Sequence, residues 1–254
     1  MKKRIFVLIF MALILLVFAG CSDANETAEI LYNPEIKSDY MEIMTHIVSS
    51  FDTNCYFIAN KQTGETIIAD PGDNAALLIK MLEENELKPV VILLTHTHGD
   101  HTGAAEKLRK TFEIPVYAWI DEKANFSGFA VTKNITWLDD ENAPLEIAGF
   151  SVRIIHTPGH TVGSVCYYVE SENVIFSGDT MFRGRSGRTD LATGDLNAMI
   201  DSFKNKLYTL SDETIVYPGH GMTTVIGSEK EQSAINEFIN TDASERRCIK
   251  YVCY

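Results

Sequence analysis

The sequence predicts an α/β protein with one folded domain. Segments of strand length and of helix length interleave along most of the chain, so helices and strands are not segregated into separate parts. The chain has 254 residues, of which 45% are hydrophobic. That content suffices for one large or two small domains and is too apolar for a disordered protein. Because no fixed-period repeat or internal linker divides the chain, one folded unit is the simplest interpretation.

The predicted domain spans residues 41–240 and begins with strands. Apolar segments of strand length lie at 41–49, 54–59 and 65–69. The turn-forming residues 60–64 separate the last two of these segments, which predicts a β-hairpin.

A helix and a buried strand are expected next. Residues 74–85 carry apolar side chains at helical spacing, and Pro89 separates this segment from the apolar run 90–94. The remaining expected elements are a helix at 103–111, a strand at 116–119, strands within 145–155, at 164–169 and at 174–176, a helix at 196–207, a strand at 214–217 and a helix at 229–238.

Residues 1–21 predict a signal peptide. Three basic residues at 2–4 precede the apolar run 5–18, and the small pair Ala19-Gly20 follows it. The apolar run is shorter than the roughly 20 residues that a membrane-spanning helix needs. We therefore expect export, with an uncleaved anchor helix as the alternative.

Small residues directly before Cys21 resemble the lipobox of bacterial lipoproteins, in which the cysteine becomes the lipidated first residue. Phe18 departs from that pattern, because leucine is more usual three places before the cysteine. The resemblance implies a membrane-anchored lipoprotein that faces outside the cytoplasm, and a secreted protein is the alternative. The polar residues 22–40 read as a tether, and residues 241–254 read as a C-terminal tail.

Charge and cysteine content limit the partners. The formal net charge is −13, so the phosphate backbone of a nucleic acid would be repelled, and we expect a small-molecule substrate.

Cys55 and Cys166 lie in apolar strands and are expected to be buried thiols. Cys248 and Cys253 could pair in an oxidising compartment, but the sequence decides neither this pairing nor the oligomeric state.

A dense cluster of metal-binding residue types follows the strand 90–94. His96 and His98 are alternate residues of an extended segment, so their side chains point the same way and can bind one ion. Asp100 and His101 follow at the expected start of a helix, where the chain turns and can direct both toward a second ion.

Three further loops repeat the same local design. Each has a short apolar strand, a glycine or proline turn and then a side chain that can bind a metal; these side chains are His160, Asp179 and His220. A rigid sheet presents functional groups on its loops in this way. Imidazole and carboxylate ligands suit zinc, although iron or manganese also fits this mixed set.

These motifs resemble those of the metallo-β-lactamase superfamily, and within it of the glyoxalase II-like hydrolases. The resemblance covers about residues 41–238 and rests on THTHGDH at 95–101, HTPGHTVGS at 156–164, SGDT at 177–180, GRTDL at 187–191 and YPGHG at 217–221. It implies an αββα sandwich of two mixed β-sheets flanked by helices, with a metal centre at one edge of the sheets.

The same resemblance implies a dinuclear site with two zinc ions per chain. Its pattern places His96, His98 and His160 on one ion. Asp100, His101 and His220 are placed on the other, and Asp179 bridges the two ions.

The expected activity is hydrolysis of a thioester by a metal-bound hydroxide, with Asp100 orienting the hydroxide or relaying a proton to the leaving group. The glutathione-binding helical domain of glyoxalase II would follow His220, where only residues 221–254 remain. A lactonase or β-lactamase and a mononuclear iron persulfide dioxygenase are therefore alternatives. Asp179 as a bridge argues against most β-lactamases. A non-catalytic, metal-stabilised lipoprotein fits less well, because structural zinc sites are usually closed and mononuclear.

Other polar residues have simpler expected roles. His46 is expected to be structural, and His156 to orient a ligand or to be structural. The segment Asp70-Pro71-Gly72 is interpreted as a turn with its aspartate as a cap. The loop 182–188 could bind an anionic group, but pairing of Arg188 with Asp190 or Asp195 is the simpler interpretation.

Overall fold

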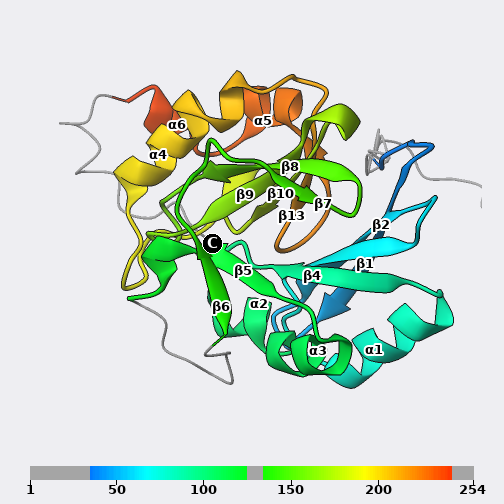
Figure 1. Ribbon diagram of the computed structural model, residues 1–254. Coiled ribbons are helices and arrows are strands. Elements are labelled where there is room, and N and C mark those ends of the chain that lie inside the picture. The colour runs from blue at the N-terminus through cyan, green and yellow to red at the C-terminus, as the bar shows by residue number, and fades with distance from the viewer. Residues whose placement is uncertain (1–34, 125–133, 242–254) are drawn as a thin grey trace, which may run out of the picture. The chain divides into compact units, whose positions relative to one another are not determined.

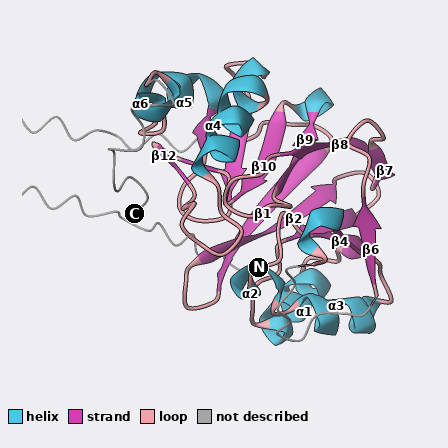
Figure 2. Ribbon diagram, turned by 90° about the vertical axis from the view of Figure 1, so that its left-hand side faces the viewer, coloured by secondary structure: helices cyan, strands magenta, loops and turns pink. Residues whose placement is uncertain are grey.

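Two six-stranded β-sheets pack face to face, and helices cover the outer face of each (Figures 1 and 2). This computed structural model describes residues 35–124 and 134–241, which belong to one compact unit, Asn33–Tyr254. The predicted α/β class and αββα sandwich are confirmed. Among the described residues, no helix is long and apolar enough to cross a membrane.

The first sheet contains the N-terminal strands in chain order. Its strands are β1 (Met41–Val48), β2 (Thr53–Asn60), β3 (Glu65–Ala69), β4 (Lys88–Leu93), β5 (Val116–Trp119) and β6 (Ile135–Leu138). The β1–β2 and β2–β3 pairs are antiparallel, and the later pairs are parallel, so the sheet is mixed. Helices α1 (Ala75–Glu84) and α3 (Ala105–Phe112) pack on its outer face.

The second sheet has the order β14-β13-β10-β9-β8-β7 and is also mixed. Its strands are β7 (Leu145–Ile147), β8 (Phe150–His156), β9 (Val165–Val169), β10 (Val174–Gly178), β13 (Ile215–Pro218) and β14 (Thr224–Val225). Its outer face is covered by α4 (Leu196–Asn205), α5 (Ile226–Gln232) and α6 (Asn236–Ile239). A small hairpin, β11 (Met181–Phe182) and β12 (Arg185–Ser186), forms a separate two-stranded sheet that packs against the second sheet through the buried Met181.

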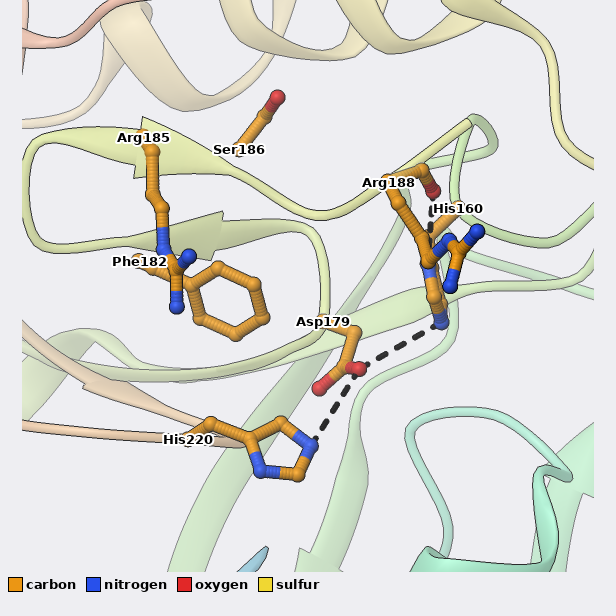
Figure 3. Close-up of a pocket in the computed structure, with 7 residues that line it drawn as sticks. All are labelled: His160, Asp179, Phe182, Arg185, Ser186, Arg188 and His220. Carbon is orange, nitrogen blue, oxygen red and sulfur yellow. Dashed lines mark hydrogen bonds and ion pairs between the residues drawn. The ribbon is translucent and has the colours of Figure 1, made fainter. Parts of the chain in front are cut away.

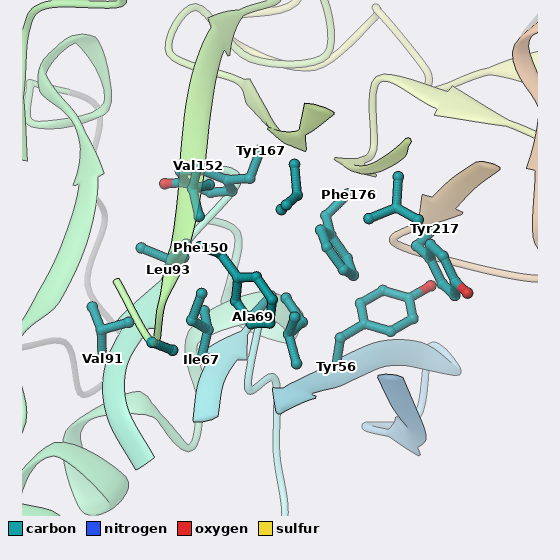
Figure 4. Packing of buried hydrophobic residues seen from close by; sticks show 14 of the residues in the cluster. Tyr56, Ile67, Ala69, Val91, Leu93, Phe150, Val152, Tyr167, Phe176 and Tyr217 are labelled. Carbon is teal, nitrogen blue, oxygen red and sulfur yellow. The ribbon is translucent and has the colours of Figure 1, made fainter. Parts of the chain in front are cut away.

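The core lies between the sheets and follows from strand alternation (Figure 4). Ile67 packs in the cluster between the sheets, which contains Val152 and Phe176 of the second sheet. The next residue, Ile68, packs in the cluster under α1 with Leu78. Since successive side chains in a strand point to opposite faces, a strand covered on both faces must be apolar at consecutive positions.

Two expected elements differ from the structure. The helix predicted at 229–238 is wrong as one element, because the chain breaks between α5 and α6. There the Ala234 N–H donates to the Gly184 carbonyl, 2.9 Å away, rather than to a helical carbonyl. The strand expected at 90–94 begins at Lys88, and Pro89 is accommodated at a shift in register against β3, where a missing N–H is tolerated.

The termini are only partly described. Residues 35–40 of the expected tether contact the domain, and the Ile36 N–H donates to the Tyr217 hydroxyl, 3.1 Å away. The predicted signal peptide, Cys21, and the tail residues Cys248 and Cys253 lie outside the described residues.

The sheet topology brings the predicted ligand loops together. Strand β9 is antiparallel to both β8 and β10, and β10 is parallel to β13. Strands β8, β10 and β13 therefore run in one direction, and their carboxyl ends meet at one edge. Two backbone hydrogen bonds near this edge each join a strand of one sheet to a loop of the other: the Val165 N–H of β9 donates to the Thr95 carbonyl at 2.9 Å, and the Asn54 N–H of β2 donates to the Gly219 carbonyl at 2.7 Å.

Candidate metal centre

Three histidines converge at one position. His96 and His98 lie in the loop after β4, and His160 lies in the loop after β8. The Nδ1 atom of His98 lies 3.0 Å from the Nε2 atoms of both His96 and His160. Burial, and then the charge of His101, hold the pKa of His96 well below its usual value. A neutral imidazole of this kind offers a lone pair to a cation.

A second group of possible ligands lies beside the first. Asp100 and His101 belong to the short helix α2 (Gly99–Thr102), and His220 follows β13. The Oδ2 atom of Asp100 lies 3.4 Å from the Nε2 of His220 and 3.6 Å from the Nε2 of His101. The Thr53 hydroxyl, 3.1 Å away, donates to the same carboxylate oxygen and fixes its direction.

Asp179, at the end of β10, contacts both groups (Figure 3). Its Oδ2 lies 3.4 Å from the Nε2 of His160 and 3.5 Å from the Nε2 of His220. Its Oδ1 lies 3.3 Å from the Nε2 of His101. All seven residues singled out in the sequence are therefore brought together, and Asp179 is placed between the two groups.

The ring orientation of four histidines is set by a partner on Nδ1. His101 donates to the Asp70 carboxylate and His96 donates to the Thr95 hydroxyl, at 3.0 and 3.1 Å. His160 and His220 donate to main-chain carbonyls, those of Arg188 at 2.8 Å and Phe51 at 2.9 Å. Such partners on Nδ1 direct Nε2 toward the candidate ion site, which is how metal-binding histidines are held in proteins.

Asp70 is a residue of the candidate centre that the sequence interpretation missed. It is buried, and besides His101 its carboxylate accepts hydrogen bonds from the Thr95 N–H at 2.8 Å and the Thr95 hydroxyl at 2.7 Å. The interpretation of Asp70 as a cap in a turn is therefore incomplete. The sequence did contain a pattern that could have indicated Asp70, because this residue follows an apolar strand just as Asp179 does.

Two atoms in the centre have no hydrogen-bond partner although they are buried. Among the described residues, these are the Nε2 of His101 and the Oδ1 of Asp179, which lie 3.3 Å apart without hydrogen-bond geometry. Unpaired buried polar atoms are rare and costly. An imidazole nitrogen and a carboxylate oxygen facing one space are both ligands for a divalent cation, so the residues fit such an ion.

Charges within the centre keep its carboxylates ionised. Burial raises the pKa of Asp179, but the charge of His101 and the contributions of the other neighbouring histidines together outweigh it and hold that pKa well below the usual range. Burial also raises the pKa of Asp100, but hydrogen bonding to His220 and the charge of His101 outweigh it and bring the pKa to about 2. Both aspartates are therefore anionic at neutral pH, as metal ligands must be.

A buried carboxylate joins two ligand loops. Glu122, at the end of the 3₁₀ helix Ile120–Glu122, accepts hydrogen bonds from the N–H and hydroxyl of Thr97, the residue between His96 and His98. Its other oxygen accepts from the Gly163 N–H at 3.0 Å, in the loop that carries His160. Glu122 thus fixes these two loops against each other, and no motif in the sequence indicated it.

Gly219 is required at the centre because of close approach. A Cβ atom there would meet Oδ1 of Asp179 and would lie 2.8 Å from Cε1 of His101. Any side chain would displace one of these groups, so the glycine before His220 belongs to the geometry of the site.

A pocket of about 250 Å³ opens beside the ligands (Figure 3). Its lining combines three metal-site residues with four residues of the β11–β12 hairpin and the loop after it. They are His160, Asp179, Phe182, Arg185, Ser186, Arg188 and His220. A small molecule in this pocket would lie directly against the candidate metal centre.

The two other histidines lie away from the ligand groups. His46 packs on the ring of Phe57, with centroids 4.4 Å apart, as expected of a structural residue. His156 stacks on Trp119 and contacts the Val162 carbonyl through Nε2 at 2.9 Å. It therefore supports the loop that carries His160, and no contact with a candidate ligand is seen in the described part of the chain.

The thiols and the loop arginine lie as predicted. Cys55 and Cys166 are buried free thiols, and burial raises the pKa of Cys166 to about 12. Arg188 pairs with Asp190 through two hydrogen bonds of 2.7 and 2.8 Å.

This chain is similar to known proteins. The family model described as the metallo-β-lactamase superfamily matches residues 49–220. The hydroxyacylglutathione hydrolase GloC of Haemophilus influenzae is 36% identical over 208 residues, which cover 76% of this chain and 96% of GloC.

Two solved structures are also similar. BLEG-1, described as a B3 metallo-β-lactamase, is 37% identical with a TM-score of 0.71, and the match covers 79% of this chain and all of BLEG-1. TTHA1623, solved in a di-iron-bound form, is 31% identical with a TM-score of 0.65, and the match covers 75% and 98% of the two chains.

Proposed function

The chain belongs to the metallo-β-lactamase superfamily, and we propose that it is a dinuclear zinc hydrolase that cleaves a thioester, in the manner of glyoxalase II. The observation that carries this proposal is the position of Asp179. Its two oxygens contact His101, His160 and His220, which belong to different ligand groups. A carboxylate that touches both groups is suited to bridge two cations.

His96, His98 and His160 would hold one ion, and Asp100, His101 and His220 would hold the other. Zinc is proposed because imidazole and carboxylate ligands suit it, while iron also accepts this set. Two such ions supply a nucleophile from bound water near neutral pH and polarise the bond under attack.

The chain's own residues complete the site. Asp100 is anionic, is held by Thr53, and faces His220, so it can orient the nucleophile or relay a proton to the leaving group. Arg188 and Phe51 keep His160 and His220 oriented through their carbonyls. A thiolate leaves readily, so a thioester needs little help from a general acid.

Similarity to GloC, which is named a hydroxyacylglutathione hydrolase, supports a thioester substrate. A second candidate is hydrolysis of a β-lactam, because BLEG-1 is described as a B3 metallo-β-lactamase and is 37% identical. Thioester hydrolysis and β-lactam hydrolysis both place a polarised carbonyl at the same centre. The geometry of the metal site therefore does not distinguish the two activities, and assays with each substrate are needed.

The test uses purified protein that has been stripped and reloaded with zinc or iron. Metal content is measured together with initial rates on a hydroxyacyl thioester, a lactone and a β-lactam. We expect about two ions per chain, which follows from the two ligand groups, and the highest kcat/KM on the thioester. One ion per chain after careful reloading would contradict the dinuclear site, and faster cleavage of the β-lactam would favour the second candidate.

We also propose that the protein is exported and anchored by lipid at Cys21. The basic start, the short apolar run and the small pair before Cys21 support this. Mass spectrometry of the native protein should show a first residue Cys21 that carries acyl chains. A free N-terminus at another position after Gly20 would instead support secretion, and an intact Met1 would argue against export.

A further inference from the structure

Three arginines lie in and beside the β11–β12 hairpin, and each has a different environment. Arg183 donates from Nε to the Thr223 carbonyl at 2.8 Å, and it does not line the pocket. Arg188 lines the pocket, but two hydrogen bonds to Asp190 neutralise its charge.

Arg185 is the third of these arginines, and it lines the pocket without a carboxylate partner among the residues described here. Its guanidinium carbon lies 5.3 Å from the centre of the Phe182 ring. Phe182 and Arg185 are direct partners across the hairpin, so the backbone itself aligns the two side chains.

The Arg185–Phe182 pair leads directly to the candidate metal centre (Figure 3). The ring of Phe182 meets the ring of His220 edge to face, with centroids 6.0 Å apart. Arg185 is thus separated from a candidate metal ligand by one aromatic ring. A contact with the face of a ring uses none of the guanidinium's N–H donors, and these donors match the two oxygens of a carboxylate or phosphate.

The hairpin is held in place before any substrate binds. The Gly184 N–H, in its turn, donates to the buried Glu229 carboxylate at 2.8 Å. The Gly184 carbonyl accepts from the Ala234 N–H at 2.9 Å. A cation on such an anchored turn has its position set by the fold, which lowers the cost of binding an anion there.

We propose that Arg185 determines specificity by binding an oxyanion group of the substrate, a carboxylate or a phosphate, while the scissile bond lies at the metal centre. This inference rests on the proposed thioester hydrolysis and narrows its substrate class to thioesters that carry such an anion. The chain's net charge of −13 repels anions at long range, so binding of an anionic substrate depends on a local cation such as Arg185.

The test compares three thioesters with the same hydroxyacyl group and different thiols. Glutathione supplies carboxylates, coenzyme A supplies phosphates, and N-acetylcysteamine is neutral. The zinc-loaded parent, Arg185→Gln and Arg185→Lys are assayed on each. We expect Arg185→Gln to lower kcat/KM about ten- to a hundredfold on the preferred anionic thioester, mainly through KM, with little change on the neutral one. Arg185→Lys should lose less.

Arg153→Gln is the matched control. Arg153, on β8, is exposed and also lies over an aromatic ring, 5.1 Å from the centroid of Tyr168, but outside the pocket. It should leave all three rates unchanged. Equal losses of Arg185→Gln on charged and neutral thioesters, or no loss on either anionic one, would overturn the inference.

A parent enzyme that cleaves none of the thioesters would overturn the proposed function, and binding then decides the role of Arg185. Calorimetry with free glutathione and with inorganic phosphate is run on the zinc-loaded parent and variants. Weaker binding of either ligand to Arg185→Gln than to Arg153→Gln supports the anion site. Unchanged binding of both ligands excludes it.

Discussion

The carboxylate of Asp70 lies 3.0 Å from the Nδ1 atom of His101 and so determines which nitrogen of that ring faces the candidate metal centre. Both side chains are almost fully buried, and His101 has no other partner on Nε2 with hydrogen-bond geometry among the described residues. Asp70, which lies outside the sequence motifs of the candidate ligands, therefore sets the ring orientation of His101.

Replacing Asp70 by Asn should weaken binding of the ion near His101 by about ten- to a hundredfold, as is typical when such a partner is lost. The amide offers one acceptor oxygen where Thr95 and His101 present three donors. Affinity is measured by competition with a chelator. Asp73→Asn, an exposed change in the same loop, should retain the parental affinity. Equal affinities for both variants would contradict the role given to Asp70.

Glu122→Gln should loosen the two loops that carry His98 and His160. The amide nitrogen would face a main-chain donor, either the N–H of Thr97 or that of Gly163, and leave it unpaired. We expect a loss of about 1–3 kcal/mol in the free energy of unfolding of the metal-free protein, measured with urea. Asp121→Asn is the control, because an amide oxygen can still accept from the indole of Trp119. A loss no larger than in this control would argue against the role of Glu122.

The sequence predicted the two sheets and the clustering of the seven candidate ligands, for a physical reason. The seven predicted ligands follow apolar strands, and strand ends at one edge of a sheet must meet. The partners Glu122 and Arg188 could not be found in this way, because a contact between distant loops, or one made by a carbonyl group, leaves no local pattern. Strand β6 was missed for a similar reason, since it is short and lies at the sheet edge, where the alternation of buried residues is weak.

The buried carboxyl of Glu229 predicts a pH dependence of stability. Burial raises its pKa above the usual 4.5, so the folded state binds this proton more tightly than the unfolded state does. The protonated Glu229 carboxyl therefore stabilises the folded protein most at a pH below the pKa that it has in the unfolded state. This stabilisation is lost as the pH rises through its higher pKa in the folded state. In Glu229→Gln the amide can still accept from the Gly184 N–H and donate to Thr224. The free energy of unfolding of the parent, measured from pH 4 upward, should fall relative to that of Glu229→Gln. A difference between the two proteins that stays constant with pH would contradict the prediction.

Asp179→Asn tests the centre itself, because the amide keeps the shape of the side chain and removes its charge. A neutral group bridges two cations poorly, so at least one ion should bind much more weakly. The rate should fall by several orders of magnitude, since the two ions together supply the nucleophile and stabilise the developing charge. Metal content and kcat/KM are measured for this variant beside the parent, after identical stripping and reloading.

His46→Ala provides the contrast that separates ligands from other histidines. The ring of His46 packs on Phe57 and its Nε2 contacts no polar group among the described residues, so its loss should leave a void and cost about 0.5–3 kcal/mol of stability. Metal content and rate should stay parental at a temperature where the variant is folded. The proposed location of the centre would be wrong if His46→Ala lost metal while Asp179→Asn kept two ions and near-parental activity. His46 lies in the middle of β1, so a rearrangement of loops could not give it the role proposed for Asp179.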